Sequence, residues 1–163
     1  TEPGHAVRVS RLARAVGQEM GLTEAQLVDL EYAALLHDLG QLSLTETIPG
    51  GATVMVPPSL QEHIAAQGAA VIRQTGVLDE VAEIVDKQAA PYRQAHQLDD
   101  GSVPLASRII RAVNAYDDLV ADAVEPGVRR QALGRLRLDM AYEFDPRVVA
   151  VLSRVVECSL RSR

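Results

Sequence analysis

Apolar residues recur every three or four positions along most of the chain, and this spacing restricts the fold to packed helices. From Val9 the apolar positions fall on a single helical face that ends near Gly21. A second helix opens at Thr23, where Gln26 three residues later completes a capping box, and Gly40 is expected to end it. No segment alternates apolar and polar residues as a half-buried strand does. The pattern predicts an all-α fold.

The rest of the chain repeats this helical pattern between two irregular segments. Ser59 and Glu62 predict a second capping box, at the start of a helix that runs to Gly76. Asp145 followed by Pro146 predicts the start of the last helix. Further helices are expected over residues 77–90, 104–120 and 127–137, and loops over 41–58 and 92–101. We therefore expect one helical bundle of about seven helices spanning residues 1–163.

Charge and composition exclude several classes of protein. Lys and Arg number 16 against 22 Asp and Glu, and the net charge of −6 disfavours binding to a nucleic acid polymer. A local cluster of arginines over residues 129–137 is expected to be a solvated helix face. The one cysteine, Cys158, excludes an internal disulfide and a cysteine zinc site, and its apolar neighbours predict that it is buried.

No run approaches the roughly 20 apolar residues that span a bilayer, and no signal peptide is visible, so a cytoplasmic location without a membrane span is expected. The chain starts at Thr1 rather than at a methionine. We expect it to be a piece of a longer, multidomain protein.

The most informative side chains are a histidine and an aspartate that close an apolar helix. His37 and Asp38 follow the run AALL and precede Leu39-Gly40. Imidazole and carboxylate are ligands that suit Fe, Mn, Zn or Ni, and two ionisable groups in apolar surroundings need a partner or a metal. The alternative is structural: Asp38 caps a neighbouring helix and His37 bonds to the backbone.

The order of several such residues carries a family resemblance. His5, His37-Asp38 within LLHDLG, His63 and the segment SVPLASRIIRAVNAYDDLV resemble, in that order, the HD-GYP branch of the HD-domain phosphohydrolases. That resemblance covers most of the chain and implies an all-α HD-domain fold. Active members hydrolyse cyclic di-GMP at a centre of two or three metals. The resemblance implies that the metal ligands here are His5, His37, Asp38, His63 and, at the position of the family's last aspartate, Asn114.

Other positions depart from the family pattern. The family's two further histidines fall near Gln88-Ala89, and the lysine that follows the signature is Gln41. The glycine-tyrosine-proline loop is replaced by PYRQAHQLDDGSVP. Asp117 and His96 could each substitute for a missing ligand. For Asp117 the competing interpretation is an ion pair with an arginine, and for His96 it is a histidine in a solvated loop.

These departures favour a regulatory function over catalysis. Two divalent cations bring four positive charges, and Asp38 is the one carboxylate left at the motif positions, so we expect at most one weakly held metal. The sequence predicts a degenerate HD-GYP-like module in bacterial signalling that has lost cyclic di-GMP phosphodiesterase activity, with no residue assigned a catalytic role. The alternative is a single-metal phosphohydrolase acting on a nucleotide or another phosphate ester. The expected partner is a protein or a fused sensor domain, with a homodimer also considered and a cyclic dinucleotide disfavoured.

Overall fold

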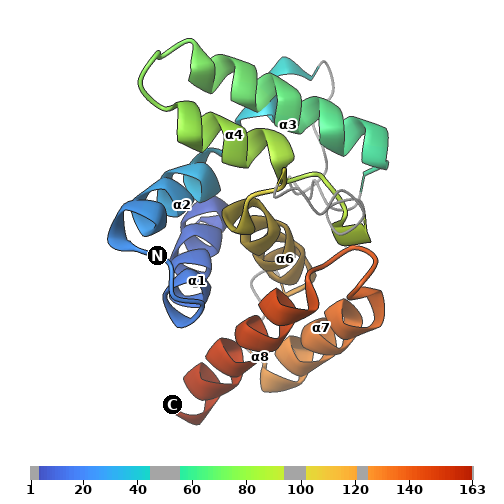
Figure 1. The fold of residues 1–163 in the computed structure, drawn as a ribbon. Helices are drawn as coiled ribbons and strands as arrows, with labels where there is room; N and C mark the ends of the chain where they lie inside the picture. Colours follow the sequence, from blue (N-terminus) through green and yellow to red (C-terminus); the bar gives the residue numbers. More distant parts are fainter. Residues whose placement is uncertain (1–3, 45–55, 94–101, 121–124, 163) are drawn as a thin grey trace.

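The computed structural model describes residues 4–44, 56–93, 102–120 and 125–162, and in these ranges the chain is built from helices (Figure 1). The described residues form seven α-helices and one 3-10 helix: α1 (His5–Glu19), α2 (Glu24–Leu36), η1 (Leu39–Ser43), α3 (Pro58–Arg73), α4 (Asp79–Lys87), α6 (Leu105–Val120), α7 (Pro126–Asp139) and α8 (Pro146–Arg161). The predicted all-α bundle is therefore confirmed. Among the described residues, no helix is long and apolar enough to cross a membrane.

Helix α6 lies in the middle of the bundle and carries the core. It packs against α1, α2, α4, α7 and α8, and Figure 1 shows these helices around it. Ile109, Ile110 and Val113 of α6 are completely buried. Ser107, also fully buried, donates a hydrogen bond from its hydroxyl to the carbonyl oxygen of Ile84 in α4, at 2.8 Å. Because α6 touches so many elements, polar side chains on it can meet residues from several parts of the sequence.

Gly40 has a different role from the one predicted. Helix α2 begins with the predicted capping box of Thr23 and Gln26, but it ends at Leu36, and Gly40 lies inside η1. A Cβ at Gly40 would stand 1.9 Å from the carbonyl oxygen of Ile64 in α3. The glycine is needed because two backbones meet there, and this contact holds the residues after α2 against α3.

Two further predictions are wrong in detail. Helix α3 begins at Pro58 after Pro57, without a side-chain cap, so the capping box expected at Ser59 does not form. Proline at the first helical position needs no amide partner and already has a helical φ, which explains the earlier start. Cys158 is exposed, because the buried face of α8 runs through Leu152 and Val156.

One prediction about charged residues is confirmed and a second holds in part. The last helix opens as predicted at Asp145-Pro146, and the Asp145 side chain caps it by accepting a hydrogen bond from the Arg147 amide. Arg135 and Arg137 form surface ion pairs with Asp139 and Glu157, as expected for a solvated helix face. Arg129, in the same predicted cluster, is instead half-buried and its Nε atom is buried.

Candidate metal centre

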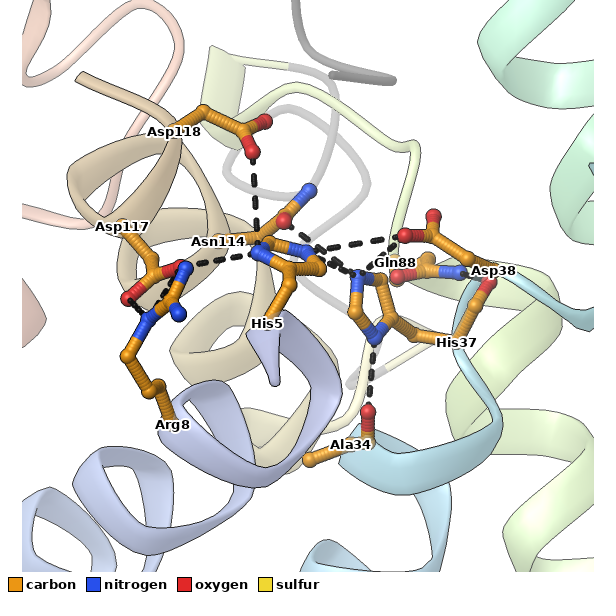
Figure 2. A network of polar contacts seen from close by, with 9 residues as sticks. All are labelled: His5, Arg8, Ala34, His37, Asp38, Gln88, Asn114, Asp117 and Asp118. Atoms are coloured by element: carbon orange, nitrogen blue, oxygen red, sulfur yellow. Dashed lines mark hydrogen bonds and ion pairs between the residues drawn. The ribbon is translucent and has the colours of Figure 1, made fainter. Parts of the chain in front are cut away.

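The start of α1 and the end of α2 bring two histidines and an aspartate together. The Nε2 atoms of His5 and His37 lie 3.3 Å apart. The Oδ2 atom of Asp38 lies 3.5 Å from the first nitrogen and 3.1 Å from the second. One ligand atom of each residue lies within 4.8 Å of the others, a spacing that could hold a metal ion (Figure 2). The resemblance placed these three residues in one site, and the fold does so from two separate helices.

Both imidazoles are fixed by a hydrogen bond on the opposite nitrogen. His37, which is 1% exposed, contacts the carbonyl oxygen of Ala34 through Nδ1 at 2.6 Å. His5 contacts the Oδ2 atom of Asp117 through Nδ1 at 2.8 Å. A carbonyl or carboxylate oxygen can only accept, so each Nδ1 carries the proton. Each Nε2 is thereby turned toward the centre, which is how metal-binding histidines are usually held.

Asn114 completes the cluster from the central helix. Its Oδ1 atom lies 3.2 Å from Nε2 of His37, and the residue is 8% exposed. Three lone-pair-bearing atoms of Asn114, His37 and Asp38 therefore converge. Acceptors in such proximity need a proton or a cation between them. The residues present therefore fit a divalent metal, although Asn114 offers a neutral oxygen where the resembling family has a carboxylate.

A second group of charges surrounds His5. Arg8 binds the Asp117 carboxylate through Nε and Nη2, each at 3.0 Å, which confirms the ion pair expected for Asp117. Burial raises the pKa of Asp117, but the hydrogen bonds from His5 and Arg8 outweigh burial and leave the pKa below its ordinary value. Arg8 was not predicted from the sequence, although its position one helical turn after His5 could have indicated that both residues meet the same partner.

The carboxylates around His5 change its protonation. A hydrogen bond to Asp117, followed by one to Asp38, raises the pKa of His5 to about 10. Asp118, also missed from the sequence, lies 3.7 Å from Nδ1 of His5, and burial raises its pKa to about 6. With no metal bound, His5 therefore carries a proton on Nε2 at neutral pH, and this proton lies among the acceptors of the cluster.

Gln88 and Ala89 lie beside the cluster, as the resemblance implied for the family's histidine pair. They line a cleft together with Asp38, Gln61, Ile64, Arg111 and Asn114, and its cavity volume is about 20 Å³. Space of this size holds roughly one water molecule or ion. The Nε2 atom of Gln88 donates a hydrogen bond of 2.6 Å to the backbone oxygen of His37. Gln88 therefore supports the backbone of the site, and the methyl group of Ala89 offers no ligand atom.

The cleft also contains a cation that was not predicted from the sequence. Arg111 is 10% exposed, and it donates to the carbonyl oxygen of Ala89 at 2.9 Å and to the carboxylate of Glu143 at 2.5 Å. Its side chain ties α6 to the end of α4 and to the segment before α8. The signal was weak, because nothing in the SRIIRAVN segment distinguishes Arg111 from its neighbour Arg108.

The two remaining predicted residues lie outside the cluster or outside the described ranges. His63 is exposed on α3, and the cleft lining includes its neighbours Gln61 and Ile64 but not His63. His96 lies outside the described residues. Four of the five predicted metal ligands, His5, His37, Asp38 and Asn114, are thus brought together, and His63 stays a prediction from the resemblance.

The sequence of this chain is similar to those of known HD-domain proteins. A family model described as "HD domain" matches residues 2–148. The chain is 24% identical over 156 residues to the cyclic di-GMP phosphodiesterase response regulator RpfG of Xanthomonas campestris, covering 90% of this chain and 41% of that protein. It is also 24% identical over 126 residues to a cyclic di-GMP phosphodiesterase of Thermotoga maritima, covering 72% and 34%. The chain thus spans less than half the length of these curated relatives.

Solved structures support the fold. A cyclic GMP-AMP specific phosphodiesterase of V. cholerae superposes with a TM-score of 0.75 at 20% identity, over 96% of this chain and 44% of that one. The HD domain of the L. monocytogenes phosphodiesterase PgpH superposes with a TM-score of 0.60 at 14% identity, over 97% and 90%. At such identities the two superpositions establish the shared helical architecture.

Proposed function

The chain belongs to the HD domain family, and from this premise we propose that it is a degenerate HD-GYP-like module that binds one divalent metal ion and no longer hydrolyses cyclic di-GMP. The observation that carries the proposal is the pairing of Gln88 with the backbone of His37, beside the methyl group of Ala89. Positions 88 and 89 therefore offer no imidazole for a second metal. A dinuclear centre would also bring four positive charges to a cluster in which Asp38 is the carboxylate available as a ligand.

The proposed metal set is His5, His37, Asp38 and Asn114. Two imidazoles already fixed through Nδ1 favour binding, because little side-chain motion must be arrested when the metal arrives. One carboxylate and one neutral amide oxygen compensate little charge, so the affinity is expected to be low. A bound ion would supply Lewis-acid chemistry and a water of lowered pKa. The residues suit Fe, Mn, Zn or Ni, and the order of preference among these metals is left to measurement.

Such a module would act through binding to another protein. We propose a regulatory function in bacterial signalling, in the cytoplasm, with a partner protein or a fused sensor domain that responds to the state of the site. Similarity to a response regulator supports this function. Gln41 stands where the family resemblance places a phosphate-binding lysine, which disfavours a cyclic dinucleotide as the ligand.

A single-metal phosphohydrolase is the second candidate, and Arg111 is the observation that favours it. This guanidinium lines the same cleft as Asp38 and Asn114, so a cation lies near the site where a phosphate ester would bind. The ion pair with Glu143 neutralises much of that charge, and for this reason we rank the regulatory function first.

One set of assays separates the two functions. The protein is purified, its metal content is measured by elemental analysis, and it is incubated with Mn²⁺ or Fe²⁺ and either cyclic di-GMP or a simple aryl phosphate. Chromatography of the products is expected to show intact cyclic di-GMP. Linear dinucleotide formed by the protein and by Glu83→Ala, a distant surface control, but not by Asp38→Ala would overturn the proposal. Cleavage of the aryl phosphate alone with the same dependence on Asp38 would establish the second candidate.

A further inference from the structure

Neutral oxygen atoms hold the Arg111 guanidinium in the cleft beside the candidate metal centre. Its Nη1 atom donates to the carbonyl oxygen of Ala89 at 2.9 Å and lies 3.5 Å from the Oε1 atom of Gln61. Its Nε atom donates to the carbonyl oxygen of Glu143 at 3.0 Å. The side chain of Arg111 is 10% exposed. These three acceptors fix the position of the guanidinium, but they do not neutralise its charge.

The charge of Arg111 is balanced by a carboxylate that lies partly in solvent. Its Nη2 atom donates to the carboxylate of Glu143, and that side chain is 46% exposed. A half-exposed carboxylate keeps part of its hydration, so it can return to water at little cost once another anion takes its place. The guanidinium would stay where it is, because its bonds to the neutral oxygens do not depend on the carboxylate. Arg111 is therefore preorganised to accept a different anion.

The turn between α7 and α8 keeps Glu143 beside Arg111. Ala141, two residues before Glu143, has a φ of 73°, a left-handed conformation that is unfavourable for a residue with a Cβ. The backbone amides of Tyr92 and Arg93 donate to the carbonyl oxygens of Glu143 and Tyr142, and Figure 1 shows the turn beside the segment that follows α4. Backbone strain persists only where surrounding contacts hold it. The carboxylate of Glu143 thus acts as an anion tethered next to the cleft.

We propose that Arg111 anchors a phosphoryl-binding site, and that Glu143 occupies this site as an internal anion until a phosphoryl group displaces it. A phosphoryl oxygen accepts from an arginine N–H as a carboxylate oxygen does. A phosphate monoester also carries about 1.5 to 2 negative charges at pH 7, against one for Glu143. The cleft holds roughly one water molecule, so the phosphoryl group replaces the carboxylate instead of binding beside it.

The size and charge of the cleft limit the ligand and its affinity. Only the phosphoryl group fits inside, so the ligand is inorganic phosphate or the terminal phosphate of a small monoester. Asp38 lines the same cleft and repels an anion. Together with competition from Glu143, this repulsion predicts a dissociation constant on the order of 1 mM for the parent protein.

This inference deepens the proposed function, on which it rests for its regulatory meaning. It assigns a ligand class to the module, namely a phosphoryl group. Exchange of this ligand with Glu143 would release a negative charge next to Tyr142, which is 66% exposed. A partner protein in contact with the α7–α8 turn would thereby detect whether the cleft is occupied.

Calorimetric titration with inorganic phosphate tests the site on the whole chain. Metal is first removed with a chelator and the chelator is removed by dialysis, so that no signal arises from phosphate bound to a metal. Glu143→Gln is expected to bind phosphate at least about tenfold more tightly than the parent, because a neutral amide competes less well for the guanidinium. Glu157→Gln is the matched control, since this carboxylate is 45% exposed and pairs with Arg137 elsewhere on the surface. It changes the net charge equally and should bind phosphate like the parent.

A double variant shows whether Arg111 is the anchor. Adding Arg111→Gln to Glu143→Gln keeps a donor for the carbonyl oxygen of Ala89 and should abolish phosphate binding. Glu143→Asp, with a shorter carboxylate and an unchanged net charge, should also bind phosphate more tightly than the parent, and it replaces Glu143→Gln if that variant does not fold.

Phenyl phosphate, titrated in parallel, distinguishes the two sources of the phosphoryl group. Tighter binding of phenyl phosphate than of inorganic phosphate by Glu143→Gln would support the site and assign it to monoesters, and the reverse order would support it and assign it to free phosphate. Equal phosphate affinities of the parent, Glu143→Gln and Glu157→Gln, or binding that survives the loss of Arg111, would refute the proposal. These titrations involve neither a metal nor turnover, so their failure is distinguishable from failure of the proposed function.

Discussion

Metal affinity at the candidate centre should depend steeply on pH, because a metal ion and a proton compete for His5. The pKa of His5 is raised to about 10, chiefly by its hydrogen bond to Asp117 and then by Asp38. Only the neutral imidazole can bind a metal. At pH 7 the group lies three units below this pKa, so about one molecule in a thousand has His5 neutral. The apparent affinity should therefore rise about tenfold for each pH unit above neutrality.

Calorimetric titration with Mn²⁺ between pH 7 and 8.5 measures this dependence. Over that range the affinity is expected to increase by about 30-fold, with close to one proton released for each ion bound. Repeating the titration in buffers of different ionisation enthalpy counts the released protons directly. Affinity that does not change with pH, or binding without proton release, would refute the reasoning about His5.

Asp117→Asn provides the decisive comparison. The variant loses the carboxylate that orients His5, which should weaken metal binding by about 10 to 100-fold at a pH where His5 is neutral in both proteins. It also loses the largest cause of the raised pKa of His5, so proton competition is relieved as the pH falls. The difference between variant and parent should shrink toward pH 7. Two parallel affinity curves would show that Asp117 acts only as a support.

Three further substitutions test other parts of the structure. Asn114→Asp restores an anionic oxygen beside His37 and should tighten Mn²⁺ binding at least about tenfold in the same titration. Equal affinities of variant and parent would contradict the role of Asn114 as a ligand. Gly40→Ala forces a methyl group into the carbonyl oxygen of Ile64 and should lower the free energy of unfolding by about 2 kcal/mol or more in urea titrations, whereas unchanged stability would rule out the close contact. Asp145→Asn removes the buried carboxylate that Arg108 binds at 2.6 Å and should cost about 3 kcal/mol in the same measurement, and a loss below about 1 kcal/mol would show that the pair is dispensable.

The helices were predictable because their signals are local. Apolar spacing marked most of the seven α-helices in the described ranges, and the caps at Thr23 and Asp145 lie where the sequence placed them. The role of Gly40 was not predictable, because the reason for a glycine there is a carbonyl oxygen of α3, more than 20 residues away. The exposure of Cys158 was also missed, since one turn of apolar neighbours does not reveal which face of a helix is buried.

The site was predictable only where a family pattern supplied it. The resemblance grouped His5, His37, Asp38 and Asn114, and the structure brings these four together. Periodicity alone could not have joined residues 5 and 114, because their proximity depends on how α1 packs against α6. Asp118 escaped notice for a related reason: its perturbed pKa arises from burial, which is a property of the assembled fold.

The hydrogen bond that Nδ1 of His37 donates to the Ala34 carbonyl oxygen has a consequence for how such a domain can evolve. His37 keeps its orientation through a hydrogen bond to a backbone atom of its own helix, and its side chain is 1% exposed. Replacing a ligand on α4 or α6 therefore does not release His37 from its place. Ligands can be lost one at a time over generations while the shape of the site persists. A domain of this fold could in this way lose metal ligands and still stay folded.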